Sequence, residues 1–121
     1  MLTANVSTEY NAGVIVGIGL DVVEISRIER AMVNERFLTR VLTLRERAIA
    51  KTPVRVAGRW AAKEAIAKAL SIDLRWQDVE ILNDERGAPV ALIDGLGDRV
   101  VHLSISHERG IAAATAIVEL R

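Results

Sequence analysis

The stretch Gly58-Arg59-Trp60-Ala61-Ala62-Lys63-Glu64-Ala65-Ile66-Ala67-Lys68-Ala69-Leu70 is the part of the chain on which the interpretation of the rest depends. It predicts a helix, because alanine and other strong helix formers fill it and its one glycine stands at its start. On such a helix Ala61, Glu64 and Lys68 share one face, so a carboxylate and an ammonium project from among methyl groups. A face of this kind lets a ligand approach closely.

Two interpretations of the Glu64 and Lys68 pair are open at this point. A surface salt bridge between positions i and i+4 is the simpler one, and it would contribute only about 0.3–0.5 kcal/mol. A ligand site is the other, and a second carboxylate upstream, Asp21, favours it. The neighbouring stripe of the helix is apolar and is expected to pack on a core; it consists of Val56, Trp60, Ala67 and Leu70.

Length and composition predict one domain with an aliphatic core. The chain has 121 residues, of which 50% are hydrophobic and only 3% aromatic. The absence of cysteine excludes disulfides and thiolate metal sites, and it suits a reducing cytoplasm. No apolar run approaches the roughly 18 residues that a membrane span needs. Residues 1–13 do not resemble a signal peptide, so we expect a flexible extension there, followed by a single domain over residues 14–121.

Charge is unevenly distributed along a chain whose formal net charge is zero. Between Ile25 and Lys63 there are ten Lys or Arg residues and three acidic ones, whereas from Glu64 onward there are six basic and ten acidic residues. The basic half predicts an anionic partner that meets one face of the protein. Nucleic acid is disfavoured, because the chain as a whole is not basic and aromatic residues for base stacking are scarce.

The first third of the chain predicts a strand followed by a helix. Val14 to Leu20 is apolar and β-branched, as in a buried strand, and Gly17 and Gly19 mark a close approach of another backbone or a ligand. Helical periodicity then predicts a helix over Val22 to Glu35, with Asp21 as its N-cap. Because a capping carboxylate can also bind a metal through its second oxygen, both roles stay open for Asp21.

The remaining elements divide into helices and strands. The arginine-rich segment 37–51 predicts one or two short helices, which Thr52-Pro53 separates from the central helix over residues 54–70. Beyond it, alternation predicts a hairpin around residues 83–87, and strands over residues 100–106 and 111–118. The fold class is therefore α+β, with helices of the first half packed on an antiparallel sheet.

Asp21 and Glu64 are two hard oxygen ligands from different elements, without a cluster of histidines beside them. Mg²⁺ is commonly held in this way, with waters or phosphate oxygens completing its shell. Lys68, one turn beyond Glu64, is placed to neutralise the same phosphates. These three residues predict phosphoryl-type chemistry, in which positioning and charge neutralisation supply most of the catalysis.

Three blocks of the sequence, in order between about Val14 and Leu120, resemble those of the holo-[acyl-carrier-protein] synthase family of 4′-phosphopantetheinyl transferases. The blocks are Gly17-Ile18-Gly19-Leu20-Asp21 with Arg27-Ile28, Arg59-Trp60-Ala61-Ala62-Lys63-Glu64-Ala65 with Lys68-Ala69, and Ser104-Ile105-Ser106-His107-Glu108. The resemblance implies the 4′-phosphopantetheinyl transferase fold. It also implies an enzyme of fatty acid biosynthesis that moves the 4′-phosphopantetheine arm of coenzyme A onto a serine of an acyl carrier protein or carrier domain, releasing adenosine 3′,5′-bisphosphate.

The resemblance further implies roles for individual residues. Asp21 and Glu64 would bind Mg²⁺, Glu64 would activate the carrier serine, and Lys68 would contact the coenzyme A phosphates and stabilise the leaving group. Additional coenzyme A contacts are expected from Arg59, His107 and Lys63, and carrier contacts from Arg27, Arg30 and Arg36. The family also implies a cytoplasmic homotrimer with its site in a cleft between subunits.

This sequence departs from the family pattern in two places. Ser71-Ile72-Asp73 stands where a glycine-containing loop is usual, and the segment between Arg47 and Val54 is shorter than is common. Two other functions fit part of the pattern: a non-catalytic module that docks an acidic helical protein through its arginines, and a different Mg²⁺-dependent phosphotransfer enzyme. Docking would need only the arginines, so the set of Asp21, Glu64 and Lys68 distinguishes an enzyme from such a module.

Overall fold

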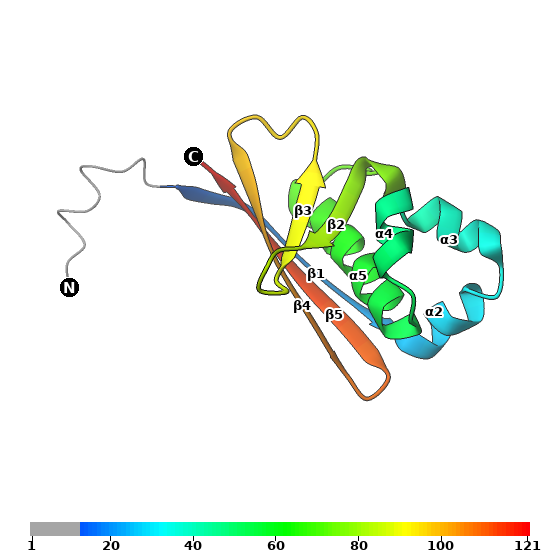
Figure 1. Ribbon diagram of the computed structural model, residues 1–121. Coiled ribbons are helices and arrows are strands. Elements are labelled where there is room, and N and C mark those ends of the chain that lie inside the picture. The colour runs from blue at the N-terminus through cyan, green and yellow to red at the C-terminus, as the bar shows by residue number, and fades with distance from the viewer. Residues whose placement is uncertain (1–12) are drawn as a thin grey trace.

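A long helix lies across a three-stranded antiparallel sheet in the computed structural model, which describes residues 13–121 (Figure 1). The strand order in this sheet is β1 (Val14–Glu24), β5 (Ile111–Leu120) and β4 (Arg99–Glu108), and the helix is α5 (Pro53–Leu70). Between β1 and α5 come three short helices: α2 (Ile25–Ala31), α3 (Glu35–Val41) and α4 (Leu44–Ile49). After α5 come η1 (Trp76–Asp78), β2 (Val79–Asn83) and β3 (Pro89–Ile93).

The predicted α+β class is confirmed, with one difference in its sheets. The second half of the chain does not form one sheet, because β2 and β3 pair only with each other, while β5 pairs with β4 on one side and with β1 from the first half on the other. The predicted short helices and the predicted hairpin are present. Thr52 caps α5 by accepting a hydrogen bond from the Arg55 backbone N–H, with Pro53 in the first turn, where its missing N–H costs nothing.

The contact between β1 and α5 depends on two glycines. Gly17 and Gly19 pair with Val118 and Ala116 of β5, on the side of the sheet that faces the helix. A Cβ atom at either glycine would overlap the carbonyl oxygen of Ala69 or Ala65 in α5. The absent side chains therefore let the helix lie directly against the strand.

The start of the first helix was predicted too early. β1 continues to Glu24, and Asp21 lies inside it, opposite Ala114 of β5, so its predicted role as an N-cap is wrong. The cap position belongs to Glu24, whose side chain makes no capping hydrogen bond. Tertiary packing explains the difference. Val23 is 3% exposed in the core, and its burial as part of a strand outweighs the local helical pattern.

The other face of the three-stranded sheet is apolar and open. Ile18, Leu20 and Val22 of β1 are 68%, 57% and 57% exposed, so the prediction of a buried strand holds for only one of its faces. No helix within residues 13–121 has the length and apolar character to cross a bilayer. The extension predicted for residues 1–13 lies, apart from Gly13, outside the described residues.

Aromatic residues anchor the short helices to α5. Trp60 of α5 stacks on Phe37 of α3, with ring centroids 5.7 Å apart, and packs against Trp76 at 4.4 Å. The predicted apolar stripe of α5 is only partly confirmed, because Ala67 is half-buried while Ala61, Ala65 and nine other residues around the helix are buried. The helix is surrounded on most sides rather than along one stripe.

Candidate active site

Asp21 and Lys68 meet where β1 lies against α5. The Lys68 ammonium donates hydrogen bonds to Asp21 Oδ1 at 3.2 Å and to the carbonyl oxygen of Leu20 at 2.9 Å. Asp21 follows Gly19 by two residues and therefore faces α5 as the glycines do. Because the glycines bring the helix close, a side chain of α5 can reach the strand at this level.

Glu64 lies one turn before Lys68 and shares a surface cleft of about 340 Å³ with it. The cleft is also lined by Ala67, Ser71, Ile72 and Asp73. Among the described residues no ion pair joins Glu64 to Lys68; the lysine pairs with Asp21 instead. The interpretation of Glu64 and Lys68 as a simple surface salt bridge is therefore wrong, and the Glu64 carboxylate stays available to a ligand.

The two carboxylates near Lys68, one in this cleft and one on β1, suit Mg²⁺. Asp21 and Glu64 supply carboxylate oxygens, and the Asp21 carboxylate already holds a cation, the Lys68 ammonium, at 3.2 Å. Within residues 13–121 no three His, Asp or Glu side chains are grouped to enclose a metal. Such a pair of carboxylates suits an ion that takes its other ligands from water and substrate phosphates.

A second cleft, of about 460 Å³, brings Arg59 and His107 together. Its lining also includes Arg55, Gly58 and Asn83, and no acidic residue. The Arg59 guanidinium donates to the Ile81 carbonyl oxygen at 3.2 Å and to Asn83 Oδ1 at 3.0 Å. Burial lowers the pKa of Arg59; Glu46 opposes the shift and the neighbouring Arg55 adds to it. Two guanidinium groups and an imidazole without a carboxylate among them suit an anionic group.

The two clefts share no lining residue. On α5, Arg59 and Glu64 are five residues apart, which places them on different sides of the helix. A single chain therefore brings Asp21, Glu64 and Lys68 together, and separately Arg59 and His107, but it does not join the two sets.

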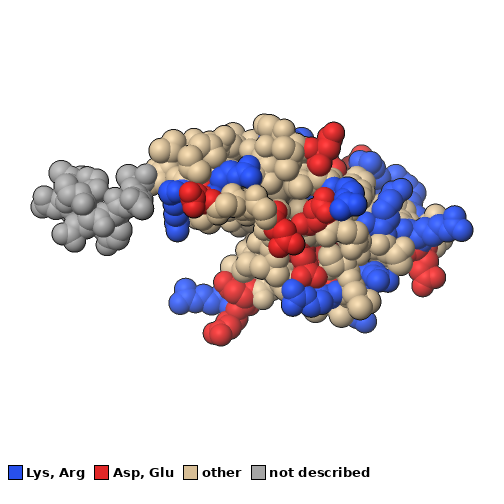
Figure 2. Space-filling model, turned by 90° about the horizontal axis from the view of Figure 1, so that it is seen from above, with Lys and Arg blue, Asp and Glu red and all other residues tan. Residues whose placement is uncertain are grey.

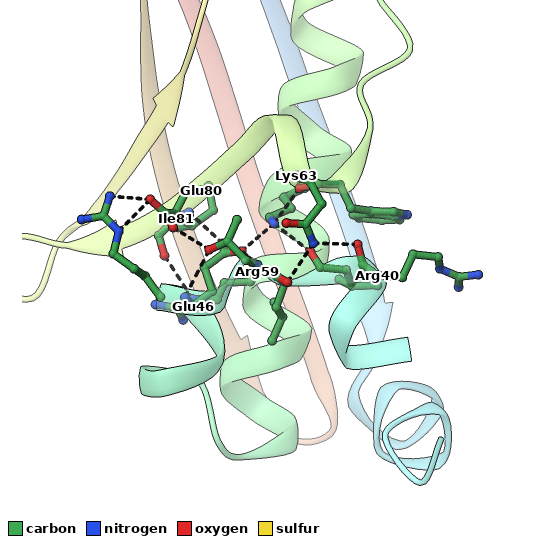
Figure 3. Close-up of polar contacts among 12 residues, drawn as sticks. Arg40, Glu46, Arg59, Lys63, Glu80 and Ile81 are labelled. Carbon is green, nitrogen blue, oxygen red and sulfur yellow. Dashed lines mark hydrogen bonds and ion pairs between the residues drawn. The ribbon is translucent and has the colours of Figure 1, made fainter. Parts of the chain in front are cut away.

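Lys63 belongs to neither cleft. It is 4% exposed, and its ammonium donates to Glu46 Oε1 at 2.7 Å, to the Val41 carbonyl at 2.8 Å and to the Trp76 carbonyl at 2.9 Å (Figure 3). Burial lowers the pKa of Lys63, and the hydrogen bond to Glu46 opposes that shift. With all three N–H donors used inside the protein, this geometry does not support the expected coenzyme A contact, and a structural role replaces it.

Lys and Arg side chains gather at the helical end of the molecule (Figure 2). A groove of about 780 Å³ between α2 and α3 is lined by Arg30, Arg36 and Arg40 around the apolar Val33 and Phe37. The third arginine expected to contact a carrier, Arg27, lies outside this lining, with its guanidinium 5.4 Å from the centre of the Trp60 ring.

Comparison with known proteins places these features in a family. Residues 17–116 match the family model described as the 4′-phosphopantetheinyl transferase superfamily. The chain belongs to this superfamily. The family predicted from the three sequence blocks is thus confirmed, and its match spans both clefts and the arginine groove.

Curated relatives of this transferase cover almost its whole length. The holo-[acyl-carrier-protein] synthase of Oceanobacillus iheyensis is 42% identical over 117 residues, covering 88% of this chain and 98% of the relative. That of a Geobacillus strain is 43% identical over 116 residues, with coverages of 87% and 97%.

Solved structures agree with the fold. The Bacillus anthracis synthase in complex with CoA (3′,5′-ADP) matches with a TM-score of 0.81 and 39% identity, covering 88% of this chain and 98% of that one. The Helicobacter pylori synthase in complex with coenzyme A matches with a TM-score of 0.78 and 30% identity, covering 84% and 98%.

Three residues that line these clefts were not among the individual site residues predicted from the sequence. Arg40, noted only as part of the arginine-rich segment, lines the arginine groove, and Arg55 and Asn83 line the second cleft. The spacing of Arg55 and Arg59, i and i+4 on one helix, was a usable signal for the second cleft. Nothing in the sequence places Asn83, which reaches Arg59 from β2, 24 residues away.

The unusual residues after Lys68 keep the backbone geometry of a helix end. Ser71 adopts a left-handed conformation, with φ 56° and ψ 40°, at the C-cap of α5. This conformation favours glycine, so the serine adopts a backbone geometry that helix ends usually assign to glycine. The shorter segment after Arg47 leaves α4 with six residues.

Proposed function

We propose that this chain is an Mg²⁺-dependent holo-[acyl-carrier-protein] synthase whose chemistry takes place at Asp21, Glu64 and Lys68. The chain transfers the 4′-phosphopantetheine group of coenzyme A to a serine of an apo acyl carrier protein, in support of fatty acid biosynthesis. The observation that carries the assignment of the site is the Lys68 ammonium on Asp21, one helical turn from Glu64, in a cleft open to a ligand.

Asp21 and Glu64 would hold the metal. When bound, Mg²⁺ neutralises charge on the phosphates of coenzyme A as the transfer proceeds. Lys68 is the cationic group placed beside them: its side chain is 54% exposed, so its ammonium can turn from Asp21 towards a phosphate oxygen. In this role it offsets the negative charge that develops on the leaving adenosine 3′,5′-bisphosphate.

Glu64 is the proposed acceptor of the serine proton. The serine oxygen forms a bond to the phosphorus that carries pantetheine, and the bond from that phosphorus to the bridging pyrophosphate oxygen breaks. The Glu64 carboxylate makes no ion pair among residues 13–121. A free carboxylate of this kind can orient a hydroxyl and receive its proton.

The second cleft would bind phosphate groups of coenzyme A through Arg59 and His107. Within a single chain this cleft does not meet the cleft of Glu64. We therefore propose that the second cleft of a neighbouring subunit completes the site, in a homotrimer with sites between subunits. Support comes from the open sheet face, where Ile18, Leu20 and Val22 are more than half exposed. Exposed apolar surface of this extent is typical of an interface. A structural histidine is the alternative role for His107.

The arginine groove would receive the carrier protein. Arg30 and Arg36 line it with Arg40, and Arg27 lies beside it on Trp60. Its cationic rim around an apolar floor suits an acidic amphipathic helix, with the charges guiding association. The cytoplasmic location stays a prediction.

The test is a mass spectrum of purified apo carrier protein after incubation with this chain, coenzyme A and Mg²⁺. We expect a mass gain of one phosphopantetheine group, which EDTA prevents and added Mg²⁺ restores. A gain that persists in EDTA would contradict the metal assignment. No gain with several carriers that bind tightly would contradict the enzyme and favour a docking module.

A further inference from the structure

The C-terminal end of α3 is held by side chains from other elements. A helix leaves its last carbonyl groups without partners of its own, and here those are the carbonyls of Thr39, Arg40, Val41 and Leu42. The Gln77 amide nitrogen in η1 lies 3.0, 3.2 and 2.8 Å from the carbonyl oxygens of Thr39, Arg40 and Leu42. The Lys63 ammonium bonds the remaining one, Val41, at 2.8 Å. Two side chains thus contact all four carbonyl oxygens at this end of the helix.

Lys63 connects this helix end to η1 and to Glu46. Lys63 also donates to the carbonyl of Trp76, the residue before Gln77, at 2.9 Å. Glu46 of α4 accepts from Lys63 at 2.7 Å and, through its other oxygen, from the Ile81 N–H of β2 at 2.8 Å (Figure 3). We call Glu46, Lys63 and Gln77 the α3 clamp, since together they connect α3, α4, α5, η1 and β2.

The α3 clamp lies between the two surfaces that the reaction requires. Helix α3 carries Arg36 and Arg40 of the arginine groove. Lys63 is followed in α5 by Glu64, so the side chain that holds α3 and the side chain that meets the serine are adjacent on one rigid helix. A docking surface that can shift must be ordered when the carrier binds, so the cost of losing the clamp falls on carrier affinity rather than on the transfer step.

We propose that Glu46, Lys63 and Gln77 are positioning residues that fix the carrier-docking arginines relative to Glu64. The inference rests on the proposed function, because it takes α3 as the surface that receives the carrier. It also replaces the direct contact between Lys63 and coenzyme A that the family resemblance implied. The two roles differ in which substrate should be affected when Lys63 is changed.

The two charged members are too deeply buried to be changed one at a time without cost. Glu46 is 0% exposed and Lys63 4%, so removing the ammonium would leave a buried carboxylate without its counterion. Gln77 is exposed, and water can replace its amide at the carbonyls of α3. Gln77→Leu is therefore the variant expected to fold normally while loosening α3.

The experiment measures KM for carrier protein and for coenzyme A separately, together with the carrier Kd by calorimetry. The variants are Gln77→Leu, Lys63→Met and the double variant Glu46→Gln/Lys63→Met. Exposed Lys51, in the loop before α5, provides the matched control Lys51→Met. Thermal unfolding of every variant reports how much of it is folded.

For Gln77→Leu we expect KM and Kd for the carrier to rise about tenfold, the equivalent of about 1.4 kcal/mol, while KM for coenzyme A stays within about twofold of wild type. Lys63→Met should show the same selectivity with a larger effect. The double variant should recover part of the loss, because Gln removes the unpaired charge and keeps an oxygen that accepts a backbone N–H. Lys51→Met should match wild type.

A raised KM for coenzyme A with an unchanged KM for carrier in Lys63→Met would overturn the proposal in favour of a coenzyme A contact. Unchanged carrier values in both Gln77→Leu and the double variant would reduce the α3 clamp to a purely structural feature, which also overturns it. A wild-type chain that binds carrier without modifying it would contradict the proposed function alone, since the carrier Kd values still test the clamp.

Discussion

Lys63 and Lys68 stand on the same helix on either side of Glu64, yet the structure gives them opposite surroundings. Lys63 is 4% exposed and donates all three N–H groups to protein acceptors. Lys68 has a side chain that is 54% exposed and is held only at the edge of a cleft, by Asp21 and the Leu20 carbonyl. A difference of five positions in α5 therefore separates an internal cross-link from a cation that can reach a ligand.

The comparison shows that burial of the partner decides the role of a lysine. Glu46 is fully buried and accepts from two backbone N–H groups as well as from Lys63, so the energy of that pair serves the fold. The charge of Asp21 is met by the Lys68 side chain, which is 54% exposed, and an ion pair with such an exposed partner contributes little to stability. Weak intrinsic pairing leaves both groups free to change partners when substrate arrives.

The largest effect is expected at the cleft. Asp21→Ala should lower the rate of transfer by about 1,000-fold, the upper range for losing one group that stabilises a transition state. Carrier affinity should be nearly unchanged, because the arginine groove is a separate surface. Time courses of holo carrier formation measure the transfer rate, and calorimetry with apo carrier measures the affinity. Exposed Asp98→Ala is the matched control, and unchanged turnover in Asp21→Ala would remove Asp21 from the site.

For the free energy of unfolding, the change at Lys63 should have the larger effect and the change at Lys68 the smaller one. Lys63→Met should lower the free energy of unfolding by about 3–5 kcal/mol, because it leaves Glu46 charged and buried. Lys68→Met should change it by less than about 0.5 kcal/mol, as is usual for an exposed pair. Urea unfolding of both variants measures this difference. Equal effects would mean that the two ion pairs do not differ as the structure shows them.

Gly19→Ala tests the close contact that creates the Asp21 and Lys68 pair. The added methyl would overlap the Ala65 carbonyl oxygen, which belongs to a helix backbone and cannot move alone. We expect a loss of about 1–3 kcal/mol in unfolding free energy, together with slower transfer. Gly58→Ala is the control, since its methyl would lie 3.1 Å from Ile105 Cγ2, a side-chain atom that can shift. A control that loses as much as Gly19→Ala would contradict the argument.

The smallest effect is expected at Glu80, which accepts hydrogen bonds from Arg45 and Thr43. Hydrogen bonds from Arg45 and then Thr43 hold the pKa of Glu80 below its usual value. The unfolded chain therefore takes up a proton before the folded one as pH falls, and the stability from this group, full above about pH 4.5, is lost at lower pH. Glu80→Gln should flatten this part of the stability profile, with exposed Glu85→Gln as control. An unaltered slope between pH 5 and pH 3, measured by urea unfolding, would contradict it.

Local sequence predicted most of the fold and selected the residues of the proposed active site. Helix formers identified α5, and the turn residues at 83–87 identified the β2 and β3 hairpin. Asp21, Glu64 and Lys68 could be selected because metal and phosphate chemistry restricts the residue types. The position of Asp21 in a strand was missed, since its pairing with Ala114 is between residues far apart in the chain.

The different roles of the lysines could not be predicted from spacing. Lys63 acquires its partners from Val41, Glu46 and Trp76, which only the folded chain brings together. Glu46 in turn looked like one acid among several arginines in an exposed helix. Spacing along the sequence does not reveal how deeply each side chain is buried, because burial depends on how α3, α4 and β2 pack against one side of α5.

The most direct test of the contrast is a pair of single-turnover transfer rates at saturating coenzyme A and carrier, normalised to folded protein. We compare Lys68→Met with Glu46→Gln/Lys63→Met, which removes the buried lysine without leaving its partner charged. We expect a rate at least about 100-fold below wild type for Lys68→Met, and within about threefold of it for the double variant, because only Lys68 is placed to meet the reacting phosphates. A slow double variant beside a near-normal Lys68→Met would contradict the role of Lys68 and place the catalytic lysine at position 63.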